Sequence, residues 1–179
     1  MDVLDFETRS RADLRALGSF VYAKDPSTSI LCMSYKLGEE KTELWIPGQP
    51  FPSDLATAIA SGRVMHAWNA AFEIDLWNEV AAPRMGWPLM PLGQWHCLMC
   101  DAGAMGFPLG LDNCAEAMGL PIQKDQEGRR AMLQLCKPNR DSMFIERDDR
   151  PDLFTALYRY CVNDTDLEVE CGIRLPRIC

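Results

Sequence analysis

The stretch Met1–Thr8, which reads M-D-V-L-D-F-E-T, predicts a buried strand that carries two acids. Its apolar residues include a β-branched valine and an aromatic phenylalanine, which are typical of a core strand. Asp5 and Glu7 interrupt the apolar run, and residues two apart in a strand point to the same face. Neighbouring carboxylates oppose each other's ionisation unless a positive charge lies between them. The pair therefore either binds a hard divalent cation or lies in solvent where the strand reaches the surface.

The composition fits a single globular domain over residues 1–179, with 47% hydrophobic and 25% charged residues. No apolar run approaches the roughly 20 residues that span a bilayer, and the N-terminus carries no secretory signal pattern. We therefore expect no membrane partner and a cytoplasmic location. In that compartment the 8 cysteines are expected to be reduced thiols, several of them in the core.

The net charge of −8 argues against binding of duplex nucleic acid through a broad basic surface. It leaves open an enzyme that holds a short strand end through metal ions, because bound cations can reverse the local field of a site.

Apolar periodicity and turn residues predict an α/β domain with a mixed sheet. After the first strand, the expected strands cover residues 30–37, 41–46 and 63–67, and the expected helices cover 54–60, 69–81, 111–118, 128–136 and 151–173. Residues 95–105 are expected to begin extended and continue as a helix. Ser53 is expected to cap the helix over 54–60, and Pro83 to end the helix over 69–81. Such sheets place their sites at the carboxyl ends of strands, where we expect Asp5 and Glu7.

A second stretch, H-A-W-N-A-A-F-E, passes from a short strand into the helix over 69–81. Asn69 and Glu73 are four residues apart and share one helical face. Phe72 can pack inward or stack against a base. The structural alternative is that Asn69 caps the helix and Glu73 is a solvated acid.

A third stretch, Y-R-Y-C-V-N-D-T-D, lies on the helix over 151–173. Tyr160 and Asp164 are four residues apart, on a face whose other residues are apolar. An acid on an inward face needs a partner. That partner is either a ligand or, in the structural alternative, a helix terminus or a nearby arginine.

In this order and at these separations, D-x-E, N-x-x-F-E and Y-x-x-x-D resemble the three motifs of the DEDD superfamily of 3′–5′ exonucleases. This superfamily, also called DnaQ-like, has an RNase H-like fold. The resemblance covers nearly the whole chain and is closest to the proofreading domain of bacteriophage-type family A DNA polymerases. It extends to the stretches W-H-C-L-M, L-D-N-C-A-E-A-M-G-L and Q-K-D-Q-E-G-R-R.

The resemblance implies an RNase H-like mixed sheet flanked by helices, and a site that binds two divalent cations, Mg²⁺ or Mn²⁺. Its four metal ligands would be Asp5, which bridges both cations, together with Glu7, Glu73 and Asp164. In such a site one metal activates the attacking water and the other stabilises the leaving 3′ oxygen. The implied reaction releases nucleoside 5′-monophosphates from DNA.

The resemblance also places the chain in the tyrosine branch of the superfamily. The other branch has histidine five positions before the last acid, where this chain has Arg159, whereas Tyr160 stands four positions before it. An unperturbed tyrosine titrates near pH ~10, so Tyr160 is expected to hydrogen bond to the attacking water without deprotonating it. One departure is Glu73, where many members have aspartate. Asp75 is the alternative ligand, about 200° around the helix from Glu73.

Four further positions are implied to contact the terminal nucleotide: Thr8, Asn69, Phe72 and Lys124. Lys124 and Asp125 form a K-D pair that either lies near DNA or makes a structural salt bridge. The implied partners are a DNA 3′ end, preferably single-stranded, and possibly a polymerase domain in cis or in trans. The implied setting is the cytoplasm of a bacterial or phage-infected cell.

Three alternatives stay open from the sequence. The chain could be a catalytically idle module that holds DNA or supports a polymerase, or it could be a 3′–5′ exoribonuclease. His96, Cys97 and Cys100 form an H-C-x-x-C cluster. Without a second well-spaced pair, this cluster is weak support for zinc, and thiols packed in the core are the structural alternative.

Overall fold

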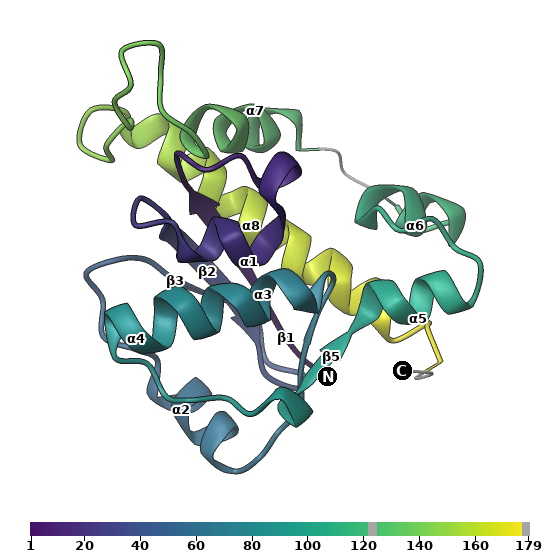
Figure 1. Ribbon diagram of the computed structural model, residues 1–179. Helices are drawn as coiled ribbons and strands as arrows, with labels where there is room; N and C mark the ends of the chain where they lie inside the picture. The colour runs from purple at the N-terminus through teal and green to yellow at the C-terminus, as the bar shows by residue number, and fades with distance from the viewer. Residues whose placement is uncertain (122–124, 177–179) are drawn as a thin grey trace.

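The computed structural model describes residues 1–121 and 125–176 and contains one five-stranded mixed sheet (Figure 1). The strands are β1 (Asp2–Arg9), β2 (Ser29–Lys36), β3 (Glu43–Trp45), β4 (Met65–Ala67) and β5 (Trp95–Cys97). Their order is β3-β2-β1-β4-β5, with antiparallel pairing among β1, β2 and β3 and parallel pairing from β1 through β4 to β5. This confirms the predicted mixed α/β sheet and is compatible with an RNase H-like fold.

Helices cover both faces of this sheet. They are α1 (Leu14–Lys24), α2 (Ser53–Ala60), α3 (Ala70–Leu76), the π-helix η1 (Trp77–Ala81), α4 (Ala82–Met85), the 3-10 helix η2 (Leu92–Gln94), α5 (Leu98–Ala104), α6 (Leu111–Ala117), α7 (Gln126–Leu135) and α8 (Pro151–Gly172). On one face, Phe6 of β1 belongs to the core that includes Tyr22 of α1 and Leu76 of α3. On the other face, Leu31 of β2 belongs to the core that includes Leu157 of α8. Among the described residues, no helix combines the length and apolar character that crossing a membrane requires.

Two expectations about helix ends are wrong. Pro83 does not end the helix, because α3, η1 and α4 follow one another without a break and Pro83 lies in the first turn of α4. Proline is tolerated there because its missing N–H is not needed in a first turn. Ser53 is not the N-cap of α2. That position belongs to Pro52, and Ser53 is the first helical residue.

The central strand β1 extends beyond its parallel neighbour. Among the described residues, β1 pairs with β4 only through Asp2 and Val3, because β4 ends at Ala67 and the chain then turns into α3. On its other side β1 stays paired with β2 as far as Arg9. Asp5 and Glu7 therefore lie inside β1 and not at its end, yet past the carboxyl end of β4, close to where α3 begins.

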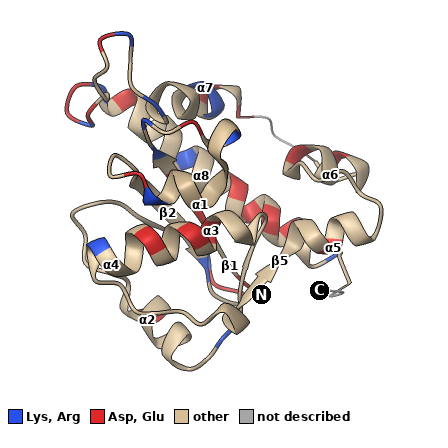
Figure 2. Cartoon of the chain, in the orientation of Figure 1, with Lys and Arg blue, Asp and Glu red and all other residues tan. Residues whose placement is uncertain are grey.

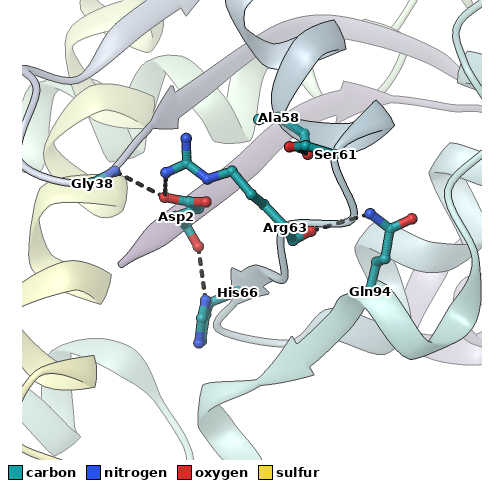
Figure 3. Close-up of polar contacts among 7 residues, drawn as sticks. All are labelled: Asp2, Gly38, Ala58, Ser61, Arg63, His66 and Gln94. Carbon is teal, nitrogen blue, oxygen red and sulfur yellow. Dashed lines mark hydrogen bonds and ion pairs between the residues drawn. The ribbon is translucent and has the colours of Figure 1, made fainter.

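A buried acid fixes the start of β1 (Figure 3). The Asp2 carboxylate accepts a hydrogen bond from the Gly38 backbone N–H at 2.8 Å and pairs with the Arg63 guanidinium. The Asp2 carbonyl oxygen lies 2.8 Å from Nδ1 of His66. Because Gly38 follows β2 and the other two partners flank or lie in β4, Asp2 holds the three central strands together at one end.

Replacing Asp2 should destabilise the fold. We expect Asp2→Ala to lower the free energy of unfolding by about 2–4 kcal/mol, because it leaves a partly buried guanidinium and an N–H without their acceptor. Urea denaturation measures the difference. Lys41→Ala, which breaks the exposed ion pair between Lys41 and Glu43, should cost less than about 1 kcal/mol. Equal stability of Asp2→Ala and the wild type would contradict this role.

Candidate active site

The three acidic sequence motifs meet in the middle of the molecule. Asp5 and Glu7 lie on β1, Glu73 lies one turn into α3, and Asp164 lies midway along α8. Figure 2 shows acidic positions on α3 and along the middle of α8. The alternation of β1 directs Asp5 and Glu7 to the face covered by α8, and the Cys161 thiol of α8 lies 3.6 Å from Oδ2 of Asp5. We call Asp5, Glu7, Glu73 and Asp164 the acid cluster.

The aspartates of the acid cluster resist ionisation. Burial raises the pKa of Asp5 to about 6, partly offset by a hydrogen bond from the Cys161 thiol. Burial and then the charge of Asp5 raise the pKa of Asp164 to about 8, partly offset by a hydrogen bond with Tyr160. Because each charge disfavours the other, the two acids share one electrostatic environment although they come from opposite ends of the chain.

The glutamates follow the same rule. Burial and then Asp5 raise the pKa of Glu7 well above its usual range, and Asp164 adds to the effect. Burial and then Asp5 also raise the pKa of Glu73. Glu73 is 4% exposed, and its Oε2 has no hydrogen-bond partner among the described residues. A buried carboxyl oxygen without a partner is costly, so this atom points to a proton or a cation as its complement.

Tyr160 borders the acid cluster as a neutral hydroxyl. It hydrogen bonds to Asp164, and burial, then the charges of Asp164 and Glu7, raise the pKa of its phenol above the usual value. Helix α7 packs directly onto this residue, because a Cβ at Gly128 would lie 2.5 Å from Cβ of Tyr160. From the sequence, Gly128 was expected only as the first residue of a helix. A glycine inside a helical stretch was the signal that could have indicated this close approach.

Sequence reasoning also missed a fifth acid, Glu168. It lies one turn after Asp164 on α8, is 3% exposed, and accepts a hydrogen bond from the Trp68 backbone N–H at 3.1 Å through Oε2. Burial, followed by Asp5, Glu73 and Asp164, raises its pKa well above the usual range. Its spacing of four from Asp164, on the inward face of the helix, was the available signal.

The chemistry of the acid cluster fits hard divalent cations. Carboxylate oxygens are the ligands that Mg²⁺ and Mn²⁺ prefer, and the orphaned Oε2 of Glu73 offers one of them. As the side chains lie, however, no three His, Cys, Asp or Glu side chains of the described residues are grouped closely enough to hold a metal ion. Binding of cations would therefore require the carboxyl groups to turn toward a common point.

The positions implied to contact a nucleotide lie in different surroundings. Asn69 is exposed at the N-cap position of α3, and its side chain caps none of the described N–H groups of the helix. Phe72 is half-buried, with its ring centroid 6.0 Å from that of Tyr22. Thr8 is buried on the opposite face of β1 from Asp5, and its hydroxyl lies 2.9 Å from the Tyr22 hydroxyl. A role of these residues in substrate contact stays a prediction.

Asp125 of the K-D pair and Asp75, the alternative ligand, both make contacts that stabilise the fold. Lys124 lies outside the described residues. Asp125 caps α7 by accepting a hydrogen bond from Gly128 N–H at 2.8 Å, and it pairs with Nε of Arg159 at 2.9 Å. For Asp125 the salt-bridge alternative is thus confirmed. Asp75 accepts a hydrogen bond from the Ser19 hydroxyl at 2.5 Å, which ties α1 to α3.

Two residues of the H-C-x-x-C cluster contact neighbouring parts of the fold. Nε2 of His96 lies 2.6 Å from Oδ2 of buried Asp101, and the Cys97 thiol lies 3.5 Å from the Trp68 carbonyl oxygen. These contacts join β5 and α5 to the segment before α3, and they favour a structural role over zinc.

A groove of about 580 Å³ opens between α7 and α8 beside Asp164. Its α7 wall carries Arg129 and Arg130, which are exposed and form no ion pair with an acid of the described residues. Asp125 also lines the groove, but its charge is neutralised by Arg159. Further acids of α8 line the opposite wall, so cations are a minority among its charged residues.

The fold and the acid cluster define an α/β domain with a partly buried site of several carboxyl groups. No family model matches the chain. In an alignment of 174 positions that covers 92% of the chain, it is 28% identical to the DNA polymerase of Bacillus phage SP02. The chain spans about a quarter of the length of this relative, 26%. It is therefore similar to a segment of a phage DNA polymerase.

The raised pKa values predict how stability depends on pH. Because Asp5 and Asp164 have folded-state pKa values of about 6 and about 8, the folded chain binds more protons than the unfolded chain above pH ~4. We therefore expect the free energy of unfolding, measured with urea and a chelator, to fall by at least ~1 kcal/mol between pH ~5 and pH ~8.

A matched pair of variants isolates this effect. Asp164→Asn should be more stable than the wild type at pH ~8 and should show a shallower decline. Asp152→Asn, at an exposed ion pair near the start of α8, should leave the decline unchanged. A wild-type stability that rises over this range would contradict the assignment.

Proposed function

We propose that the chain is a metal-dependent 3′–5′ exonuclease that hydrolyses single-stranded or frayed DNA ends to nucleoside 5′-monophosphates. The observation that carries this proposal is the convergence of Asp5, Glu7, Glu73 and Asp164 from three distant segments into one partly buried cluster, whose members influence one another's pKa. Such a concentration of acids has little structural benefit, whereas it suits cations that act on a phosphodiester. Similarity to a phage DNA polymerase supports DNA as the substrate.

In the proposed reaction, two Mg²⁺ or Mn²⁺ ions, when bound, activate water and stabilise the leaving oxygen. The four carboxyl groups would hold these ions, and because the pKa of Asp164 is about 8, binding would displace a proton from this group at neutral pH. Tyr160 stays protonated, because its pKa is raised, and its hydroxyl hydrogen bonds to Asp164. In the proposed reaction this hydroxyl would turn from Asp164 to donate its one hydrogen bond to the attacking water.

The groove between α7 and α8 is the proposed path of the strand. It opens beside Tyr160 and Asp164, so a strand lying in it would place its 3′ end at the acid cluster. Arg129 and Arg130 would contact phosphates along the way. Asn69, Phe72, Thr8 and Lys124 are the proposed contacts of the terminal nucleotide, where stacking on Phe72 would tolerate any base. A polymerase domain, in cis or in trans, is the proposed source of the DNA end.

One observation favours the idle-module alternative. No three candidate ligands of the described residues are grouped closely enough to hold a metal ion. A chain that holds DNA without cutting it would need no such group. The exonuclease proposal is preferred because a module that only holds DNA would gain nothing from four carboxyl groups withdrawn from solvent into one site.

Nuclease assays with matched variants test the proposal. The wild type should release mononucleotides from a 5′-labelled single-stranded DNA oligonucleotide with Mg²⁺ or Mn²⁺, and none with a chelator. Asp5→Ala should lower kcat by at least ~1,000-fold, because removing a ligand of both cations removes their transition-state stabilisation. Its thermal stability should match or exceed that of the wild type, since a buried repulsive charge is lost.

The same assay separates the alternatives. Asp152→Asn, which removes an exposed acid from the same protein, should retain full activity. DNA binding without mononucleotide release under either metal would favour the idle module and sink the exonuclease proposal. Faster digestion of a matched RNA oligonucleotide would reassign the substrate to RNA.

The groove makes a separate kinetic prediction. Arg129→Ala/Arg130→Ala should raise KM for the oligonucleotide about 3- to 10-fold with kcat within about 2-fold, because phosphate contacts of this kind stabilise substrate and transition state equally. The effect should shrink at high salt. Arg140→Ala/Arg150→Ala, which removes the same charge outside the groove lining, is the control. An unchanged KM in the first variant would place the strand elsewhere.

A further inference from the structure

Glu168 is a buried acid for which the four-carboxylate reaction has no use. It lies on α8 one turn beyond Asp164, with 3% of its surface exposed. It does not line the groove beside Tyr160, so neither substrate nor bulk solvent approaches it from there. Burying an ionisable group is costly, so its presence calls for a function inside the protein.

The contact that Glu168 makes joins two segments of the site. Its Oε2 accepts the Trp68 backbone N–H at 3.1 Å, across 100 residues of sequence. Trp68 follows β4 and is separated from α3 by Asn69 alone, so the hydrogen bond connects α8 directly to the base of the helix that carries Glu73.

Trp68 is a rigid anchor for this contact. Its indole N–H donates to the Leu109 carbonyl oxygen at 2.7 Å, and its own carbonyl oxygen accepts from Met99 N–H at 2.8 Å. The side chain is 8% exposed and packs in the same core as Leu98. Two hydrogen bonds and core packing therefore hold Trp68 in place. A hydrogen bond to its N–H fixes α8 against this well-anchored segment.

We propose that Glu168 is a positioning residue that sets the distance between Glu73 on α3 and Asp164 on α8. This inference rests on the proposed exonuclease function. The hydrogen-bond acceptor, and not the negative charge, is what positions the helices, since Asp5, Glu73 and Asp164 all disfavour another charge at this point. A glutamine has the same shape and keeps an acceptor oxygen, whereas an alanine has none.

The difference between Glu168→Gln and Glu168→Ala tests the proposal. Glu168→Ala should lower kcat about 100-fold, because a displacement of about 1 Å in a catalytic group has that order of effect, with KM within about 3-fold. Glu168→Gln should restore kcat to within about 5-fold of the wild type. The Trp68 amide should be protected from hydrogen exchange in the wild type and in Glu168→Gln, and exposed in Glu168→Ala.

Two other results would overturn the proposal that Glu168 positions the helices. Loss of activity in Glu168→Gln equal to that in Glu168→Ala would mean that the charge itself is needed, as in a fifth metal ligand. Full activity of Glu168→Ala would mean that no positioning is required. Asp152→Asn is the control for removal of an exposed acid from α8.

A measurement of metal binding distinguishes failure of the positioning role from failure of the proposed exonuclease function. Titration calorimetry with Mn²⁺ alone should give a dissociation constant about tenfold higher for Glu168→Ala than for the wild type, and an unchanged one for Glu168→Gln. If the wild type degrades no nucleic acid but binds Mn²⁺ with this pattern, the exonuclease proposal fails and the positioning role stands. If the wild type binds no Mn²⁺, both fail.

Discussion

Repulsion among carboxyl groups that are wholly or partly buried is the constraint on which the rest of this structure depends. The charge of Asp5 raises the pKa of both Glu73 and Asp164, so nothing in the acid cluster itself holds its members together. Apolar cores on both faces of the sheet must do so. Asp2, three positions from Asp5 on the same strand, shows the contrast, because its carboxylate is matched by the Arg63 guanidinium. One acid of β1 stabilises the fold, and the next opposes it.

The shortness of strand β4 allows the carboxyl groups of the acid cluster to come together. Because β4 ends at Ala67, the chain enters α3 next to the middle of β1. Glu73 therefore lies beside the edge of β1 that β4 leaves unpaired. Helix α8 covers the face of β1 to which Asp5 and Glu7 point, and carries Asp164 to it. Gly128 lets α7 approach Tyr160 closely, so the site is bounded on that side by backbone and not by a bulky side chain.

Most elements could be predicted from the sequence, because apolar periodicity and turn residues are local signals. The motif acids could also be assigned to their elements, although the order of strands that brings them together is not a local property. The role of Glu168 could not be predicted. Its spacing of four from Asp164 indicates an inward position, whereas Glu170 lies on the outer side of α8 and pairs with Arg174. That the partner of Glu168 is the Trp68 N–H depends on packing between segments that are distant in sequence.

The last helix has a consequence for the order of events during synthesis. Cys161 and Asp5 meet across 156 positions of the chain, and such distant contacts form late, after large loops have closed. On the ribosome, β1 emerges long before α8. While the polypeptide grows, Asp5 and Glu7 therefore stay solvated. The free-energy cost of withdrawing their charges from water arises only when α8 packs, and by then nearly all of the apolar residues have been synthesised.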